Sequence, residues 1–289
     1  MELLYKKETK ILRGLIYEVR NELGGGWSEE IYHQALLHNL AENKIPFQSK
    51  PRFPLTHRET EVYSFEPDVV VWDKIILELK VLPKFKDKNF PSENEAQIIQ
   101  YLKRFEKKLG MLVNFAPSRV GIKRMAYEPP KMEVSEDYER IKGKLAEPDR
   151  KLLQRIREVI LEFGQTYGTG YSERVYRSLL ALEFIDKSIK CNREVQLCPS
   201  WKNQKLGTQY TNHLLVEDKF LILVKSAIDH PSAYDFIQTQ SFLEALNLSV
   251  GLVLNFGKNK FQIIGTAVNQ THQRSSLSAS LNMNQIGDS

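Results

Sequence analysis

Two carboxylates and a lysine flank a short apolar hairpin pattern in the first half of the chain. Asp68 precedes one apolar run, Glu78 and Lys80 close the next, and residues 72–74 between the runs predict a tight turn. In such a hairpin Asp68 and Glu78 lie opposite each other across the two strands. Strand alternation places Glu78 and Lys80 on one face and turns Leu79 into the core.

This set of side chains indicates a specific kind of chemistry. A carboxylate that is buried without a partner is costly, so such groups are usually paired or bound to a metal ion. Two carboxylates form an oxygen-rich site that suits Mg²⁺ or Mn²⁺ better than zinc. A neighbouring lysine can orient a water molecule or stabilise charge on a phosphate. The alternative is a surface hairpin in which Glu78 and Lys80 form an ordinary salt bridge.

Two helices are expected before the hairpin. Apolar spacing predicts one helix over residues 8–23 and a second over about 28–43. Glu29 stands in the first turn of the second helix and shares a face with Tyr32, three residues later. The helix dipole favours a carboxylate at this place, so Glu29 either serves the helix alone or also belongs to the site.

After the hairpin we expect a helix over 92–109, on which Gln97 and Tyr101 share one face as an i, i+4 pair. Short strands are expected at 45–47, 60–65, 111–115 and 120–127. The loop between the hairpin and this helix carries three lysines, at positions 84, 86 and 88, and is either a substrate contact or a solvated loop.

Residues 8–127 resemble a known family. Pro67-Asp68, followed by Glu78-Leu79-Lys80, resembles the signature of the PD-(D/E)XK nuclease superfamily. Gly26, Glu29 and Tyr32 fit the Gly-x-x-Glu-x-x-Tyr motif of its GxxExxY family. Gln97 to Tyr101 resembles the Gln-x-x-x-Tyr helix of the lambda-exonuclease-like branches, and residues 114–124 resemble the closing strands.

The resemblance implies an α/β fold of the restriction-endonuclease-like type, with a central mixed sheet flanked by helices, and a phosphodiesterase that acts on nucleic acid. The implied cofactor is one or two ions of Mg²⁺ or Mn²⁺. The implied metal ligands are Asp68, Glu78 and the backbone carbonyl of Leu79. The other implied catalytic residues are Glu29, which completes the shell, and Lys80, which positions or activates water. The implied supporting residues are Tyr32, Gln97 and Tyr101.

The second half of the chain repeats the first. Residues 170–176 carry the same Gly-x-x-Glu-x-x-Tyr pattern as residues 26–32, and residues 251–256 echo residues 110–115. Gln238 and Phe242 stand where Gln97 and Tyr101 do, which gives a lag of about one domain throughout. The chain is therefore predicted to be a tandem duplication.

The second copy lacks the two principal carboxylates. Aligning Lys225 with Lys80 places His213 over Asp68 and Leu223 over Glu78. These residues do not form an oxygen cage for a hard cation. We interpret Glu173 and Lys225 as an inherited helix start and strand end; a different site built from His213 and Glu173 is the alternative.

These patterns predict the domain organisation. We expect a nuclease-like domain over 1–128, an acidic, proline-broken linker over 129–147, a degenerate second nuclease-like domain over 148–268 and a disordered tail over 269–289. The two repeats are expected to form an intramolecular pseudo-dimer that replaces a homodimer.

Composition excludes several other classes. The 289 residues are 42% hydrophobic and 27% charged, and the net charge of +5 permits contact with nucleic acid without requiring it. No apolar run is long enough to span a membrane and the N-terminus has no apolar signal core. Cys191 and Cys198 form no disulfide framework or zinc motif, and together these features indicate a cytoplasmic protein.

The sequence thus predicts a metal-dependent nuclease whose first domain is catalytic and whose second domain is structural. The alternative is a non-catalytic nucleic-acid-binding or adaptor protein on the same fold. The sequence leaves open DNA or RNA as substrate, attack at ends or within the strand, and sequence specificity.

Overall fold

The computed structural model describes residues 3–83, 90–129, 131–202 and 204–268. The chain divides into two compact units, Met1–Pro130 with Gly170–Val175, and Lys131–Thr169 with Tyr176–Ser289. The three lysines at 84, 86 and 88 and the predicted tail lie outside the described residues. None of the helices in the described ranges combines the length and apolar character needed to cross a membrane.

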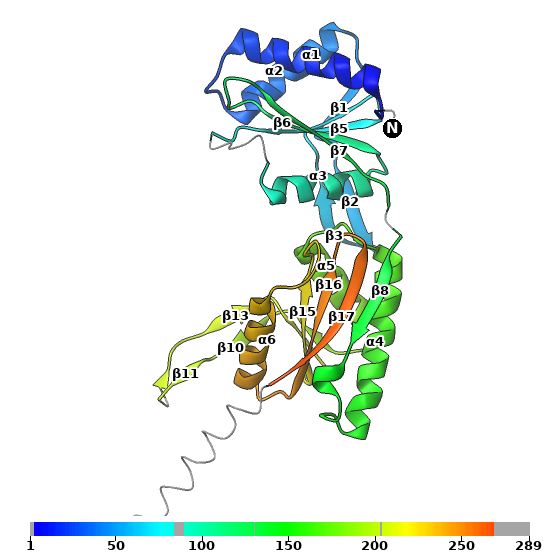
Figure 1. Cartoon of the computed structure of the whole chain (residues 1–289), viewed down its shortest axis with the longest axis vertical. Helices are drawn as coiled ribbons and strands as arrows, with labels where there is room; N and C mark the ends of the chain where they lie inside the picture. Colours follow the sequence, from blue (N-terminus) through cyan, green and yellow to red (C-terminus); the bar gives the residue numbers. More distant parts are fainter. Residues whose placement is uncertain (1–2, 84–89, 130, 203, 269–289) are drawn as a thin grey trace, which may run out of the picture. The chain divides into compact units, whose positions relative to one another are not determined.

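The first unit is a five-stranded mixed sheet with helices on both faces. In spatial order its strands are β1 (Phe47–Ser49), β4 (Val69–Val71), β5 (Ile75–Lys80), β6 (Leu109–Asn114) and β7 (Gly121–Ala126). Strands β5 and β6 are parallel and the other neighbours are antiparallel. A separate hairpin contains β2 (Phe53–His57) and β3 (Thr60–Phe65). Figure 1 shows α1 (Lys6–Leu23) and α2 (Glu29–Glu42) on one face of the sheet and α3 (Ser92–Arg104) on the other.

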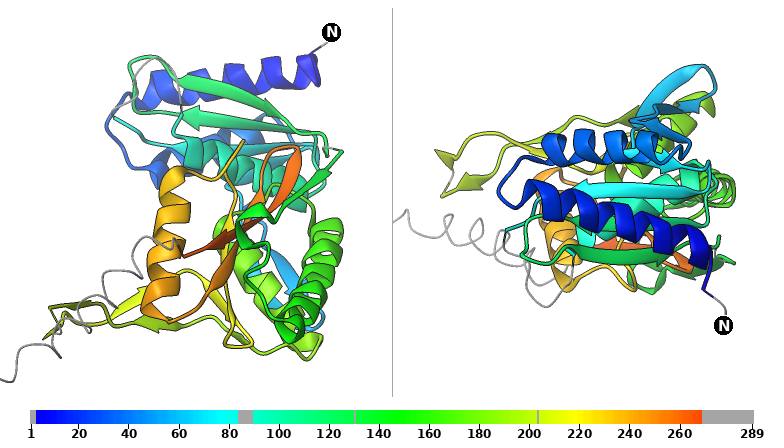
Figure 2. Two further views of the ribbon diagram at one scale, coloured as in Figure 1. Left: turned by 60° about the horizontal axis from the view of Figure 1, so that its bottom comes forward. Right: turned by 90° about the horizontal axis from the view of Figure 1, so that it is seen from above.

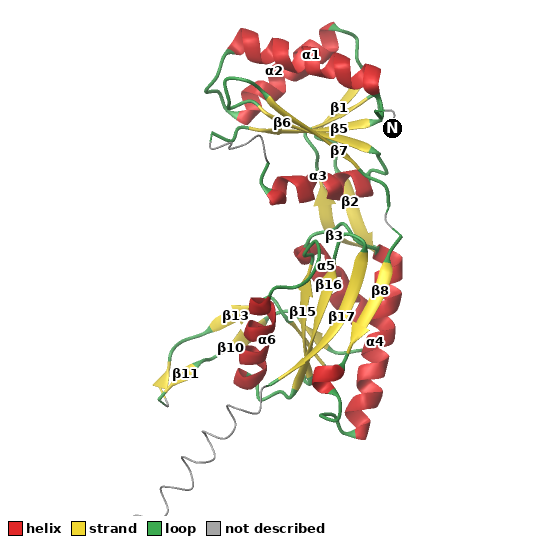
Figure 3. Cartoon of the chain, viewed as in Figure 1, coloured by secondary structure: helices red, strands yellow, loops and turns green. Residues whose placement is uncertain are grey.

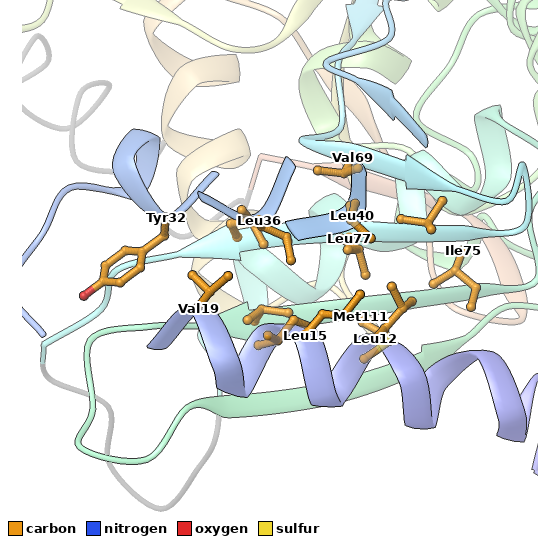
Figure 4. Packing of buried hydrophobic residues seen from close by; sticks show 14 of the residues in the cluster. Leu12, Leu15, Val19, Tyr32, Leu36, Leu40, Val69, Ile75, Leu77 and Met111 are labelled. Carbon is orange, nitrogen blue, oxygen red and sulfur yellow. The ribbon is translucent and has the colours of Figure 1, made fainter. Parts of the chain in front are cut away.

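The core of this unit lies between the sheet and the first two helices. Figure 4 shows side chains of α1 directed toward side chains of α2 and of strands β4, β5 and β6. Strand β5 is buried at five of its six positions because both of its faces are covered by helices. The buried residues that meet here include Leu12, Leu15, Val19, Leu36, Leu40, Val69, Ile75, Leu77 and Met111.

The predicted hairpin is present. The loop between the paired strands is residues 72–74, where Trp72 and Asp73 have positive φ, 52° and 53°, and the Lys74 N–H donates to the Val71 carbonyl over 3.0 Å. The antiparallel register pairs Val69 with Leu77, so that Asp68 and Glu78 follow as opposite positions. The turn and the register therefore bring the two carboxylates together.

The second unit repeats this arrangement. Its sheet runs in the order β8 (Glu133–Asp137), β17 (Lys260–Ala267), β16 (Val250–Phe256), β15 (Phe220–Lys225), β14 (Leu214–Val216) and β9 (Cys191–Asn192). Strands β14 and β15 form a hairpin, and β15 pairs with β16 in parallel, as β4, β5 and β6 do in the first unit. Helix α6 (Ala233–Ala245) covers one face, and α4 (Glu147–Tyr167) and α5 (Glu173–Asp186) the other (Figures 1 and 3). Both units thus have the predicted α/β architecture.

The stretch expected to be a linker differs from the prediction. Residues 133–137 form strand β8, which pairs in parallel with β17, and they are followed by a short helix, η1 (Glu139–Ile141). Arg157 of α4 holds the strand through two contacts of 2.6 Å to the carboxylate of Glu136. An edge strand often exposes charged side chains, so its composition resembles that of an acidic linker. This resemblance explains why the sequence pattern predicted a linker here.

Two boundaries also differ. The helix expected over 92–109 ends at Arg104, and Leu109 already opens β6. The strand expected at 45–47 begins at Phe47 instead. Element ends are set by long-range pairing, which local patterns do not contain.

One element of the second unit was not anticipated. A long hairpin leaves the sheet between β9 and β14 and projects from its unit (Figure 2). Strands β10 (Val195–Leu197) and β13 (Gln209–Thr211) pair near its base, and β11 (Ser200–Trp201) and β12 (Gln204–Lys205) pair near its tip. We call residues 195–211 the arm.

Candidate active site

Asp68, Glu78 and Lys80 gather at the carboxyl end of β5. The paired part of β4 stops at Val69, so the Leu79 N–H extends past it and donates to Asp68 Oδ2 over 2.6 Å. Lys80 Nζ lies 2.7 Å from Glu78 Oε1. The N–H and C=O of a strand residue point to the same side, so the Leu79 carbonyl lies on the Asp68 side of the strand.

Glu78 is the most unusual of these groups. It is only 2% exposed, and its Oε2 atom has no hydrogen-bond partner within the described part of the chain. Burial, followed by the charge of Asp68, raises the pKa of Glu78 to about 7, although Lys80 acts in the opposite direction. A buried carboxylate oxygen without a partner is costly, and a bound cation or a proton removes that cost.

Lys80 is held as a cation. Its side chain is 15% exposed, and burial alone would lower its pKa. The carboxylates of Glu78, Glu29 and Asp68 outweigh burial, so the pKa of Lys80 is raised. Lys80 is therefore a hydrogen-bond donor and a positive charge beside the two carboxylates.

Glu29 lies at the side of this group. It is the first residue of α2 and half-buried. Burial raises its pKa, Lys80 opposes this and Asp68 adds to it, so Glu29 is within electrostatic reach of both. Across the described ranges, however, no three His, Cys, Asp or Glu side chains come close enough to hold a metal ion together. The structure therefore pairs Asp68 with Glu78 and keeps Glu29 as a neighbour.

Gln97 and Tyr101 approach the site from α3. Gln97 Nε2 donates to the Tyr101 hydroxyl over 2.8 Å. Burial and then the charge of Glu78 raise the pKa of Tyr101, which places the phenol near the carboxylates and keeps it neutral. The pair lines a pocket of about 230 Å³ together with Tyr63, Phe65, Glu93, Asn94 and Gln100.

Tyr32 lies in the core of the first unit, beside the loop that leads into α2. Its hydroxyl donates to the Gly24 carbonyl over 2.9 Å, and its ring stacks on Phe115 with centroids 4.5 Å apart. Figure 4 shows the hydroxyl pointing away from the aliphatic cluster. Tyr176 of the second unit makes the same bond to the Gly168 carbonyl, over 2.7 Å. In both units this tyrosine fixes the loop that leads into the helix.

His33 belongs to the site and was missed by sequence reasoning. It is 3% exposed, and its Nε2 lies 3.2 Å from the backbone carbonyl of Asp68. A carbonyl only accepts, so Nε2 carries the hydrogen in this contact. The Lys50 N–H donates to the same carbonyl over 2.9 Å. The available signal was its spacing, one helical turn after Glu29.

Asn114 was noted only as part of a repeated strand. Its Oδ1 accepts from the Leu82 N–H over 2.9 Å and its Nδ2 donates to the Leu82 carbonyl over 3.1 Å. Asn255 makes the equivalent two bonds to Ala227. This asparagine fixes the chain two residues after the site lysine in each unit.

In the second unit, the positions equivalent to Asp68, Glu78 and Lys80 hold a different set of polar contacts. His213 is 1% exposed, with Thr211 Oγ1 2.5 Å from Nδ1 and Thr239 Oγ1 2.9 Å from Nε2. Burial lowers the pKa of His213 to about 4, so the imidazole is neutral at pH 7. Leu223 stands opposite it, and Lys225 lies 3.4 Å from Asp235 of α6.

Among the comparisons with known proteins, the match to a family model agrees with this fold. The family model described as the PD-(D/E)XK nuclease superfamily matches residues 6–125 and again residues 150–265. No curated protein matches the chain. A solved structure, described as the crystal structure of SSO0001, is 22% identical over 42% of this chain and 59% of that chain, with a TM-score of 0.29, so this chain spans less than two thirds of that protein. Because the family model covers most of the chain in two matches, the chain belongs to the PD-(D/E)XK nuclease superfamily and contains two restriction-endonuclease-like domains.

Proposed function

We propose that the first unit hydrolyses phosphodiester bonds of nucleic acid and depends on Mg²⁺ or Mn²⁺. The observation that carries the proposal is the buried Oε2 of Glu78, which has no hydrogen-bond partner among the described residues and lies across the hairpin from Asp68. A purely structural hairpin gains nothing from this arrangement, because it leaves a costly group unsatisfied.

The donor set fits a hard divalent cation. Asp68, Glu78 and the Leu79 carbonyl offer only oxygen atoms, which Mg²⁺ and Mn²⁺ prefer. A bound ion of this kind polarises the phosphoryl group and lowers the pKa of water. The raised pKa of Glu78 also fits, since a carboxylate destabilised by burial gains most from a cation.

The remaining residues then have distinct roles. Protonated Lys80 orients the attacking water and stabilises negative charge that develops on the phosphate. Glu29 accepts a proton from that water, a role supported by its raised pKa and by its electrostatic coupling to Lys80 and Asp68. His33 holds the backbone of Asp68 from behind, as outer-shell groups do around metal ligands.

The second unit is proposed to be a non-catalytic copy that arose by duplication, and the first unit to belong to the GxxExxY family. The loss of chemistry is supported by His213 and Leu223, which replace both carboxylates with a hydrogen-bonded neutral ring and an aliphatic side chain. The family assignment is supported by Tyr32 and Tyr176, which make the same bond in both units. The motif tyrosine is thus retained for structure where the carboxylates are not.

The test is cleavage of labelled single- and double-stranded DNA and RNA by the purified chain, with Mg²⁺, Mn²⁺ or EDTA. The proposal predicts cleavage of at least one substrate with metal and none with EDTA. Circular substrates separate attack within the strand from attack at ends. Binding of substrate without cleavage under every metal condition would instead favour a non-catalytic nucleic-acid-binding protein.

A further inference from the structure

The arm of the second unit has no part in the proposed chemistry. We propose that it is a binding surface for single-stranded nucleic acid, with bases stacked on Trp201 and Tyr210 and phosphates held by Lys202 and Lys205. This inference goes beyond the proposed function, because the arm lies in the unit that lacks the carboxylates.

The base of the arm is fixed to its own unit. Val195 and Leu197 are 2% and 3% exposed, and Val195 packs in a buried cluster with Leu221 and Leu243. Thr211, the partner of Val195 in the antiparallel register, is also buried. The arm therefore has a defined root from which its outer part projects (Figures 1 and 2).

The outer part exposes large apolar side chains. Trp201 is 59% exposed, Leu206 63% and Tyr210 68%. Every described residue from 198 to 210 is exposed. Large exposed apolar side chains on a projecting element usually mark a binding surface, because they lower solubility without adding to a core.

The charge of the arm indicates a negatively charged partner. Residues 195–212 contain Lys202 and Lys205 and no aspartate or glutamate. Lys202 Nζ lies 4.5 Å from the centre of the Trp201 ring, so an aromatic face and a cation stand together. In the first unit, by contrast, Arg52 beside the β2–β3 hairpin is paired with Glu61 over 2.7 Å.

An aromatic ring beside a cation and a second exposed aromatic ring, in a segment without any carboxylate, fit a polyanion that carries flat rings. Bases of a single strand expose their faces and stack on aromatic side chains while the backbone follows a positive surface. A duplex hides those faces and would meet only the two lysines. The arm is therefore matched to single strands, whether DNA or RNA.

The experiment measures binding in EDTA, so that no metal-dependent cleavage occurs. Fluorescence anisotropy follows labelled single-stranded DNA, single-stranded RNA and duplex DNA with the full chain. Trp201→Ala with Tyr210→Ala should weaken single-strand binding by at least about 20-fold, since each stack is worth at least about fivefold in affinity. The matched control is Tyr234→Ala, a tyrosine of α6 that is 66% exposed, and it should bind like wild type.

The lysines are tested by salt dependence. Lys202→Gln with Lys205→Gln should reduce the slope of log affinity against log salt by about 1.4, or about 0.7 for each phosphate contact to a single strand. Lys258→Gln, at an exposed lysine outside the arm, is the control for loss of charge. All variants alter exposed side chains, so thermal unfolding should match wild type.

The inference is overturned if the double aromatic variant binds single strands as tightly as the Tyr234→Ala variant, or if the double aromatic substitution weakens duplex binding as much as single-strand binding. Absence of any binding by wild type also overturns it and would direct attention to a protein partner. These outcomes are independent of cleavage: a chain that binds through the arm and cuts nothing refutes the proposed function and leaves the arm intact.

Discussion

Replacing Glu78 by glutamine should stabilise the metal-free protein, and by an amount that depends on pH. The pKa of Glu78 rises from 4.5 to about 7 on folding, chiefly because of burial. This rise in pKa corresponds to about 3 kcal/mol of free energy lost by the folded state when the carboxyl is ionised, at about 1.36 kcal/mol per pKa unit. Glutamine has nearly the same shape as glutamate and removes the charge. After the substitution Lys80 still has the carboxylates of Glu29 and Asp68 near it.

The pH window follows from the direction of the shift. Below pH 4.5 the carboxyl is protonated in both the folded and the unfolded chain, so its burial costs no charge desolvation. As the pH rises from 4.5 through about 7, the folded state must deprotonate a buried group and loses stability. Glu78→Gln should therefore gain up to about 3 kcal/mol over wild type at pH 8.5 and little at pH 4.5.

The assay is urea unfolding in EDTA, followed by tryptophan fluorescence in a Trp201→Phe background. The two remaining tryptophans, Trp27 and Trp72, both lie in the first unit, so the signal reports that unit. Glu22→Gln, at an exposed glutamate, is the control and should change stability by less than about 0.5 kcal/mol. Mg²⁺ should stabilise wild type at pH 8.5 and leave the Glu78→Gln variant nearly unchanged. A gain of equal size at both pH values, or a loss at pH 8.5, would refute the reasoning.

Three further predictions follow from the hydrogen bonds. His33→Ala should weaken Mn²⁺ binding at least about tenfold, as measured by calorimetry. His33→Gln can still donate to the Asp68 carbonyl and should recover part of that affinity. An equal loss of affinity in both variants would contradict the positioning role. Tyr32→Phe removes the hydrogen bond to the Gly24 carbonyl and should lower the free energy of unfolding in urea by about 1 kcal/mol, with little change in the cleavage rate. A large loss of cleavage rate would instead show that the hydroxyl takes part in the chemistry. Burial lowers the pKa of His213 from 6.5 to about 4, so the second unit should lose stability as pH falls from 6.5 toward 4. In acid unfolding, His213→Leu should make stability depend less on pH over this range. The same dependence on pH in the variant and in wild type would contradict the burial of a neutral His213.

Much of the site followed from local patterns. The opposition of Asp68 and Glu78 depends only on two apolar runs and the short turn at residues 72–74, and the register of the hairpin agrees with it. The pairing of Gln97 with Tyr101 depends only on helical spacing. Such features are encoded within about a dozen residues, where periodicity is informative.

The rest depends on contacts between distant segments. His33 matters only because α2 packs against the strand end that carries Asp68, and nothing in its own neighbourhood records this contact. Strand β8 forms because β17, more than a hundred residues later, offers an edge. The arm consists of strands two or three residues long, most of whose side chains are exposed, so any alternation of apolar and polar residues is too short to detect.

The most direct test of the central claim is the rate of metal-dependent cleavage in matched variants. Asp68→Asn is compared with Asp73→Asn, an exposed turn residue of the same hairpin, and Lys80→Ala with Lys108→Ala, at an exposed surface lysine. Removing one group that acts on the developing charge should slow cleavage by at least about 100-fold, and the two controls should cleave like wild type. If Asp68→Asn and Lys80→Ala cleave at the wild-type rate, the chemistry lies elsewhere and the proposed site is wrong.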